Sequence, residues 1–163
     1  MNLPVRKSTR LRNFDYSNHG VYFVTICTKD KRKTLSRIVG GGAYDAPRII
    51  LTEKGKIVEK YILSTNNIKN VAIDKYVIMP NHIHMLIFLE NEDGTSRAPS
   101  PTNMMIPHIV GTLKRFVNRD CGEDLFQRSF FDHIIRDYKD YALRWNYIEN
   151  NPARWCEDKY YCE

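Results

Sequence analysis

The amino-acid sequence predicts an α+β fold, in which helices pack on one face of an antiparallel sheet. Four segments are rich in β-branched and aromatic residues, and most of them alternate in the way that strands do. Three other segments space their apolar residues at helical intervals. The chain has 163 residues and is 42% hydrophobic, which is enough for one sizeable core. We therefore expect residues 1–163 to form a single domain.

The first half of the chain predicts one strand, one helix and a pair of strands. GVYFVTICTK, which begins at Gly20, is typical of a strand, and the glycines at 40–42 indicate a loop. Thr52 is a suitable N-cap for a helix that ends near Asn66 and Asn67, with an apolar face of Ile57, Val58, Tyr61 and Ile62. The segments VAIDKYVIM and HIHMLIFL then predict two antiparallel strands separated by a Pro-Asn turn.

The second half predicts a loop, a helix, a strand and a terminal helix. Residues 91–102 are polar and contain glycine and proline, which indicates a flexible loop. A second amphipathic helix is predicted from Ile106, Ile109, Val110, Leu113, Phe116 and Val117. A fourth strand is predicted over 130–136, and Asp137 is expected to cap a last helix that ends before Pro152, leaving 153–163 as a C-terminal tail. This order matches the ferredoxin-like split βαβ arrangement, βαββαβ, with one additional C-terminal helix.

The charge of the chain suits a polyanionic partner, although it does not prove one. Lys and Arg outnumber Asp and Glu by 25 to 19, a formal net charge of +6. Residues 1–19 form a basic N-terminal arm without apolar periodicity, either a solvated tail or a nucleic-acid contact. The candidate DNA-binding residues are Arg6, Lys7, Arg10 and Arg12 in this arm and Lys114, Arg115, Arg128 and Arg136 beyond it.

Cysteine usage and hydropathy indicate a cytoplasmic protein with no membrane partner. The cysteines contain no CxxC pair and follow no secretory segment, so neither a zinc knuckle nor a disulfide framework is indicated. Nowhere do about eighteen apolar residues follow one another, as a transmembrane helix requires. We expect reduced thiols in the cytoplasm.

Two histidines are candidates for a metal site. His82 and His84 lie two residues apart in a predicted strand, so they project from the same face, roughly 7 Å apart along the chain. Two imidazoles at that spacing can share one divalent ion, and the open positions of the ion can bind and polarise a phosphate. Two edge-strand histidines satisfied by hydrogen bonds fit the same spacing, so both interpretations stay open.

The last predicted helix supplies a candidate nucleophile. Trp145 and Tyr147 face in different directions, and Asn151 lies one turn beyond Tyr147 on the same side. A phenol serves as a covalent nucleophile only if it loses a proton with an ordinary pKa of about 10, and a metal-bound phosphate beside it helps. A half-buried tyrosine followed by a helix-ending asparagine also fits this spacing.

The segment YVIMPNHIHMLI resembles the signature of single-tyrosine HUH transposases, especially the REP-associated tyrosine transposases and their insertion-sequence relatives. GVYFVTICT, FQRSFFDHIIRD and YIENNPARW agree in the same order, so the resemblance covers most of residues 8–155. It implies an enzyme that cuts single-stranded DNA beside hairpins, leaving a 5′-phosphotyrosine link and a free 3′-hydroxyl that can later rejoin strands.

The resemblance also implies roles for individual residues. His82 and His84 match the metal-binding pair, Tyr147 matches the nucleophile, and Asn151 matches the third, amide-bearing ligand of Mg²⁺ or Mn²⁺. Insertion-sequence members usually have glutamine at this last position, so Asn151 is closer to the REP-associated branch. The expected partner is single-stranded DNA with a hairpin, and both a homodimer and a monomer are compatible with the resemblance.

Two other functional classes are alternatives for this sequence. A ferredoxin-like domain that binds single-stranded RNA or DNA without cutting needs only basic and aromatic residues. However, no strand matches the RNP1 pattern, and binding alone does not explain why His82, His84 and Tyr147 coexist. A zinc-dependent hydrolase would have too few predicted ligands.

Overall fold

The computed structural model describes residues 20–41, 45–90 and 105–161. The basic arm 1–19 and the loop 91–102 that the sequence predicts lie outside these residues. The elements are β1 Gly20–Cys27, β2 Ser36–Val39, β3 Arg48–Leu51, α1 Glu53–Ser64, β4 Val71–Ile78, β5 His82–Leu89, α2 Met105–Cys121, β6 Phe131–Ile135 and α3 Tyr138–Asn150. Three short 3-10 helices accompany them, namely η1 Lys29–Lys31, η2 Thr65–Asn67 and η3 Pro152–Glu157.

The main sheet has the predicted ferredoxin-like topology. Its four strands lie in the order β4-β5-β1-β6, and every neighbouring pair is antiparallel. The two central strands, β1 and β5, are therefore not adjacent in sequence, as the split βαβ arrangement requires. β6 is an edge strand of the sheet that the described residues form.

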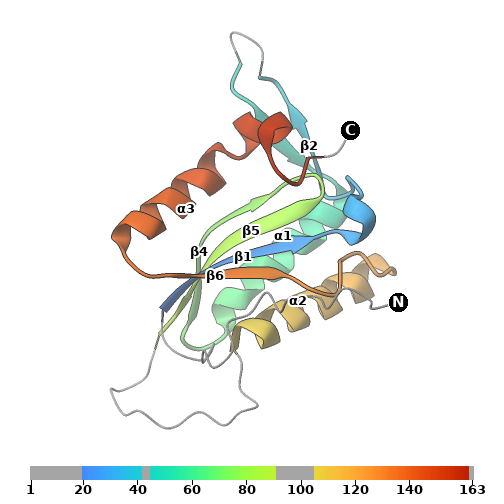
Figure 1. Cartoon of the computed structure of the whole chain (residues 1–163). Coiled ribbons are helices and arrows are strands. Elements are labelled where there is room, and N and C mark those ends of the chain that lie inside the picture. Colours follow the sequence, from blue (N-terminus) through green and yellow to red (C-terminus); the bar gives the residue numbers. More distant parts are fainter. Residues whose placement is uncertain (1–19, 42–44, 91–104, 162–163) are drawn as a thin grey trace, which may run out of the picture.

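The helices cover both faces of this sheet (Figure 1). α1 and α2 pack on one face, over a core that includes Ile83, Met85 and Ile87 of β5. α3 crosses the opposite face, where Ile148 packs on Phe23 and on other residues of the sheet. The structure thus confirms the predicted antiparallel sheet with two helices on one face, and the additional C-terminal helix occupies the other.

Two predicted helix starts are confirmed by their capping bonds. The Thr52 hydroxyl accepts a hydrogen bond of 3.1 Å from the backbone N–H of Gly55. The Asp137 carboxylate accepts one of 2.8 Å from the backbone N–H of Asp140. Each bond satisfies a backbone donor that the helix itself leaves free, so the cap fixes where the helix begins.

The hairpin of β2 and β3 has no counterpart among the strands that the sequence predicts. These strands have four residues each and pair only with one another, in a separate two-stranded sheet. The hairpin is fixed by contacts with the turn between β4 and β5: the Ser36 hydroxyl donates to the Ile78 carbonyl at 2.8 Å, and the Leu35 N–H donates to the Pro80 carbonyl at 3.0 Å. Such distant partners leave no mark in a four-residue pattern.

The chain beyond α3, for which the sequence predicts only a tail, folds back onto the sheet. η3 begins at Pro152, and the residues after it return to the start of β5. There the side-chain amide of Asn81 donates to the Tyr160 carbonyl at 2.8 Å. This return brings Asp158 and Tyr160 beside the two histidines.

Candidate functional site

His82 and His84 project from the α3 side of β5, and both are fully buried. Their ring centroids are 4.5 Å apart. The alternate residues of β5 point into the core under α1 and α2, so the predicted sharing of one face by the two histidines is confirmed.

One nitrogen of each imidazole ring has a hydrogen-bond partner that orients the ring. Asn81 uses its amide N–H groups on the carbonyls of Tyr160 and Lys31, so its Oδ1 atom is left to accept from His82 Nδ1 at 2.8 Å. The proton of neutral His82 therefore lies on Nδ1, and Nε2 carries a free lone pair. His84 Nδ1 lies 2.8 Å from the hydroxyl of Thr25, the residue directly opposite it in β1.

The other nitrogen of each histidine has no partner. His82 Nε2 and His84 Nε2 are buried, and neither forms a hydrogen bond with any residue that the structure describes. Hydrogen bonds thus satisfy only one nitrogen of each ring. Buried polar atoms are normally paired, and metal-binding histidines typically engage a second partner through the nitrogen that is not ligating, as Nδ1 does here.

Burial keeps both histidines neutral. It lowers the pKa of His82 to about 4, and it lowers the pKa of His84 well below the ordinary value. The positive charges of Lys159 and Arg144 also lower the pKa of His84. Neutral imidazoles with free lone pairs are the form that binds a metal.

This lowered pKa predicts how stability depends on pH. Without metal, the unfolded chain protonates His82 below pH 6.5, whereas the folded chain does so only near pH 4. We expect the free energy of unfolding to fall by about 3 kcal/mol from this group as the pH drops through that window. Urea denaturation with a chelator, between pH 4 and 7, measures it. His82→Gln should flatten this dependence of the free energy of unfolding on pH, whereas His108→Gln, an exposed control, should not. Equal slopes in the wild-type protein and both variants would show that His82 is not the group responsible.

Asp158 completes a cluster with metal-ligating geometry. Single ligand atoms of His82, His84 and Asp158 all lie within 4.8 Å of one another. The side-chain amide of Asn151 donates to Asp158 Oδ2 at 2.7 Å, and its own Oδ1 atom is buried without a partner among the described residues. Two histidines and a carboxylate form a donor set that fits a divalent ion, and the unpaired amide oxygen belongs to a residue bonded to that carboxylate.

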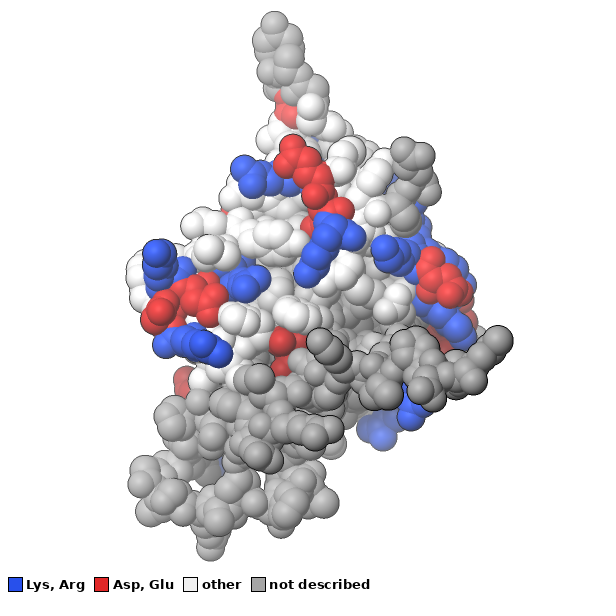
Figure 2. Space-filling model, viewed as in Figure 1, with Lys and Arg blue, Asp and Glu red and all other residues white. Residues whose placement is uncertain are grey.

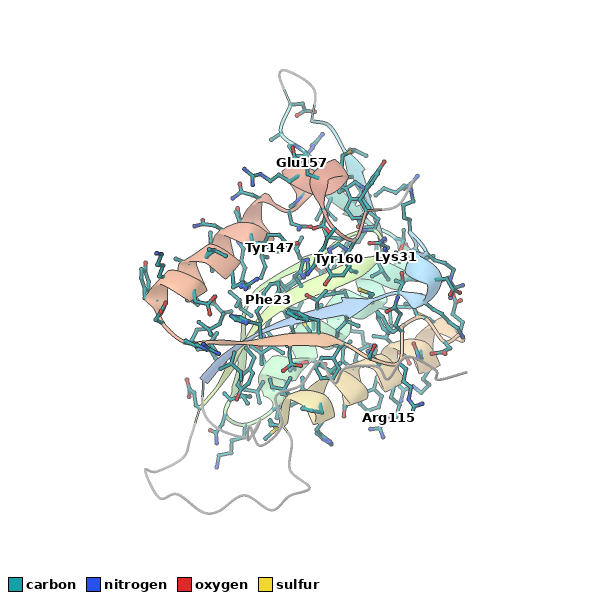
Figure 3. The ribbon with its side chains drawn as sticks, in the orientation of Figure 1. Phe23, Lys31, Arg115, Tyr147, Glu157 and Tyr160 are labelled. Carbon is teal, nitrogen blue, oxygen red and sulfur yellow. The ribbon has the colours of Figure 1, made fainter. Side chains whose placement is uncertain are left out.

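Tyr147 of α3 lies against this cluster. Its ring centroid is 5.2 Å from that of His84, and its hydroxyl donates to Asp158 Oδ2 at 2.9 Å. Figure 3 shows Tyr147 and Tyr160 reaching toward the sheet from α3 and from the segment after η3. Burial and the bond to Asp158 raise the pKa of the Tyr147 phenol, so it is protonated at neutral pH.

A cavity of about 600 Å³ opens beside the Tyr147 side chain. It lies between α3 and η3, and Asn146, Tyr147, Asn151 and Asp158 are among the residues that line it. Tyr147, Asn151 and Asp158 therefore all border the same cavity.

The structure distributes the predicted DNA-binding residues unevenly. Arg6, Lys7, Arg10 and Arg12 lie outside the described residues. Lys114 donates to the carbonyls of Gln127, Arg128 and Ser129, at 2.7 to 3.3 Å, and so fastens the segment that leads into β6. Arg115 lies on α2, away from Tyr147 (Figure 3). Arg128 and Arg136 are exposed near the two ends of β6.

Sequence reasoning missed Asp158, Thr25, Arg144 and Lys159. Thr25 and Asp158 come from segments far from the histidines in sequence, and only the strand register and the return of the chain after η3 bring them there. Arg144 did carry a signal, because it lies three residues before Tyr147 and hence on the same side of the helix.

Comparison with known proteins identifies the relatives of this chain. No known family model matches it. An uncharacterized protein of Haemophilus influenzae is 33% identical over 97% of this chain and 94% of its own length. A second protein of that organism, provisionally named a REP-associated tyrosine transposase, is 28% identical over 86% of this chain and 74% of its own. The REP-associated tyrosine transposase of Escherichia coli K12 is 23% identical over 85% of this chain and 70% of its own length. The chain is therefore a homologue of proteins named REP-associated tyrosine transposases.

A solved structure agrees in fold. A REP-associated tyrosine transposase bound to a REP hairpin superposes with a TM-score of 0.64, over 92% of this chain and 76% of that one, at 21% identity. This likeness confirms the α+β architecture of the chain. Among its described residues, no helix is both long and apolar enough to cross a membrane.

Proposed function

We propose that this REP-associated transposase cleaves single-stranded DNA beside a hairpin, with Tyr147 as the nucleophile and a divalent ion on the histidine pair. One observation carries the proposal: the Tyr147 hydroxyl bonds to the Asp158 carboxylate, which lies within 4.8 Å of a ring nitrogen of each of two buried histidines whose Nε2 atoms are unpaired among the described residues. A structural tyrosine needs no such neighbours. A tyrosine that attacks a phosphodiester needs a phosphate-binding group beside it.

The proposed step exchanges one phosphoester bond for another. The Tyr147 oxygen attacks phosphorus and forms a 5′-phosphotyrosine, while the bond from phosphorus to the 3′-oxygen breaks and the departing 3′-hydroxyl takes up a proton. Asp158 is the acceptor already bonded to the phenol, at 2.9 Å, and is therefore the nearest group to receive its proton. Because the link is an ester, the free 3′-hydroxyl of a strand can reverse the step and rejoin DNA.

The ion would be Mg²⁺ or Mn²⁺, held by His82, His84 and the amide oxygen of Asn151, with Asp158 as a further oxygen ligand. When bound, it supplies positive charge that polarises phosphate oxygens and stabilises charge developing on them. The residues of the chain do the positioning: Thr25 and Asn81 hold the imidazole rings, and α3 holds the phenol.

The hairpin in the proposed substrate is suggested by the relative whose structure contains a REP hairpin. Within this chain, Tyr147 already contacts His84 of the same molecule. A monomer therefore contains the complete set of proposed site residues, and a homodimer is not needed to bring the phenol to the histidines.

The experiment that tests the proposal is a search for a covalent adduct. The protein is incubated with labelled single-stranded hairpin DNA and Mg²⁺ or Mn²⁺, and the products are separated under denaturing conditions. We expect a denaturant-resistant protein–DNA band and a shorter DNA with a free 3′-hydroxyl. Binding without an adduct or cleavage would instead support the non-catalytic domain that binds single-stranded nucleic acid.

A further inference from the structure

One turn of α3 separates the proposed nucleophile from an arginine on the same side of the helix. Tyr147 lies against His84 of β5, and Arg144 lies over Phe23 of β1, with its guanidinium carbon 5.2 Å from the ring centroid. Phe23 in turn stacks on His84, with 5.1 Å between centroids. A single layer of contacts thus connects the guanidinium to the histidine pair.

The Arg144 side chain contacts one carboxylate, that of Asp140, and is partly exposed. Its Nε atom lies 3.5 Å from Asp140 Oδ1, and the other oxygen of this carboxylate is bonded to His133 at 2.7 Å. The contact with Asp140 is an ion pair and not a hydrogen bond: Arg144 Nε is buried without a hydrogen-bond partner among residues 20–41, 45–90 and 105–161, and 29% of the side chain is exposed. Asp140 therefore holds the guanidinium by charge, while the buried Nε donor is left without a hydrogen bond among the described residues.

A second cation lies on the same face, nearer to the start of β6. The Lys159 amino group is 5.2 Å from the ring centroid of Phe131 and 4.8 Å from that of Tyr160. Phe131 is directly opposite Thr25 in β1, and Thr25 is directly opposite His84 in β5. Lys159 thus lies over the row of paired strand residues that contains His84. Arg144 lies over the neighbouring row, which contains Phe23.

The spacing of the two cations suits a polyanion. Phe23 and Phe131, the rings beneath them, lie on neighbouring strands and two residues apart, so their backbone positions are on the order of 8 Å from each other. This is comparable to one nucleotide of an extended strand. Both cations also lower the pKa of His84, so their fields reach the site. Figure 2 shows Lys and Arg side chains on this face together with Asp and Glu side chains, with uncharged surface between them.

We propose that Arg144 and Lys159 bind two successive phosphates of the strand next to the scissile phosphate, so that a single DNA strand crosses the face of β1 and β6. The inference rests on the proposed function and extends it to the path of the substrate. The guanidinium fork matches two phosphate oxygens at once, and the lysine acts as a point charge. An arginine with only a structural role would have its donors paired within the fold.

The first test measures how DNA binding depends on salt. The protein carries Tyr147→Phe so that it cannot cut, and a labelled hairpin with single-stranded extensions reports binding by fluorescence anisotropy from 50 to about 300 mM salt. We expect Arg144→Gln and Lys159→Gln each to lower the log-log slope by about 0.7, because each removes one contact to a single-strand phosphate. Affinity at low salt should fall roughly tenfold, and Arg144→Lys should keep most of the slope.

The matched control is Lys139→Gln, which removes the same charge from an exposed position on α3. It should leave the slope and the affinity unchanged. If Arg144→Gln and Lys159→Gln behave like this control, the proposed contacts do not exist.

The second test changes the DNA instead of the site. Single methylphosphonate linkages, which remove one phosphate charge, are moved one position at a time along the strand beside the hairpin. We expect two linkages to weaken binding strongly, and Arg144→Gln to add nothing further at one of them. A uniform effect at every linkage would overturn the proposal, even if the variants failed to fold.

These outcomes separate the inference from the proposed nuclease. If Arg144→Gln adds nothing further at one methylphosphonate linkage and no covalent adduct forms, the protein holds a strand along this path without cutting it. An adduct with no coupled linkage would keep the nuclease and reject the strand path.

Discussion

Replacing Tyr147 by phenylalanine is expected to abolish the covalent protein–DNA adduct and to reduce cleavage by at least about 10³-fold. The substitution removes only the hydroxyl that donates to Asp158, while the ring keeps its contacts with His84 and Phe23. Binding of hairpin DNA should therefore change by less than about twofold. Denaturing gels of the adduct and anisotropy with the same labelled strand measure the two properties.

Tyr141 provides a closely matched control on the same helix. Its hydroxyl also donates to a carboxylate, that of Asp74, at 2.6 Å, and this bond and burial raise its pKa to about 12. Tyr141→Phe thus removes an equivalent hydrogen bond at a position away from the histidines, and it should keep cleavage and adduct formation. If Tyr147→Phe retains full activity, or if Tyr141→Phe loses as much, Tyr147 is not the nucleophile.

Replacing either His82 or His84 by alanine is expected to lower metal-dependent cleavage more than about 100-fold, since losing a mere supporting partner of a ligand typically costs 10–100-fold. Calorimetric titration with Mn²⁺ should show lost or much weaker binding in both variants. DNA affinity, which depends on phosphate contacts elsewhere, should persist with its salt dependence intact.

Two comparisons keep this prediction specific. His108→Ala changes an exposed histidine of α2 and should leave cleavage unaltered. Thr25→Val removes the hydroxyl that lies 2.8 Å from His84 Nδ1, and it should produce an intermediate loss of metal affinity. Full cleavage by the wild-type protein in excess chelator would refute the metal assignment.

The sheet and its helices were predictable because each element carries its own local pattern. The alternation in β5 directs the histidines to one face and Ile83, Met85 and Ile87 to the other, and this holds in any correct pairing of the strand. Thr52 and Asp137 marked helix starts through a short-range capping bond. The β2–β3 hairpin has no comparable local signal, because its two short strands are fixed by the backbone around Ile78 and Pro80.

The sequence by itself determined the order of the main-sheet strands and the helices, the shared face of His82 and His84, and the position of Tyr147 one turn before Asn151 on the last helix. Only the tertiary structure decided which groups meet there. Asp158 reaches the site because the chain turns back after Pro152, and Arg144 reaches Phe23 because α3 crosses the sheet at that point. Periodicity and capping act within a few residues and so can be read along the chain, whereas contacts between distant segments depend on packing the whole fold at once.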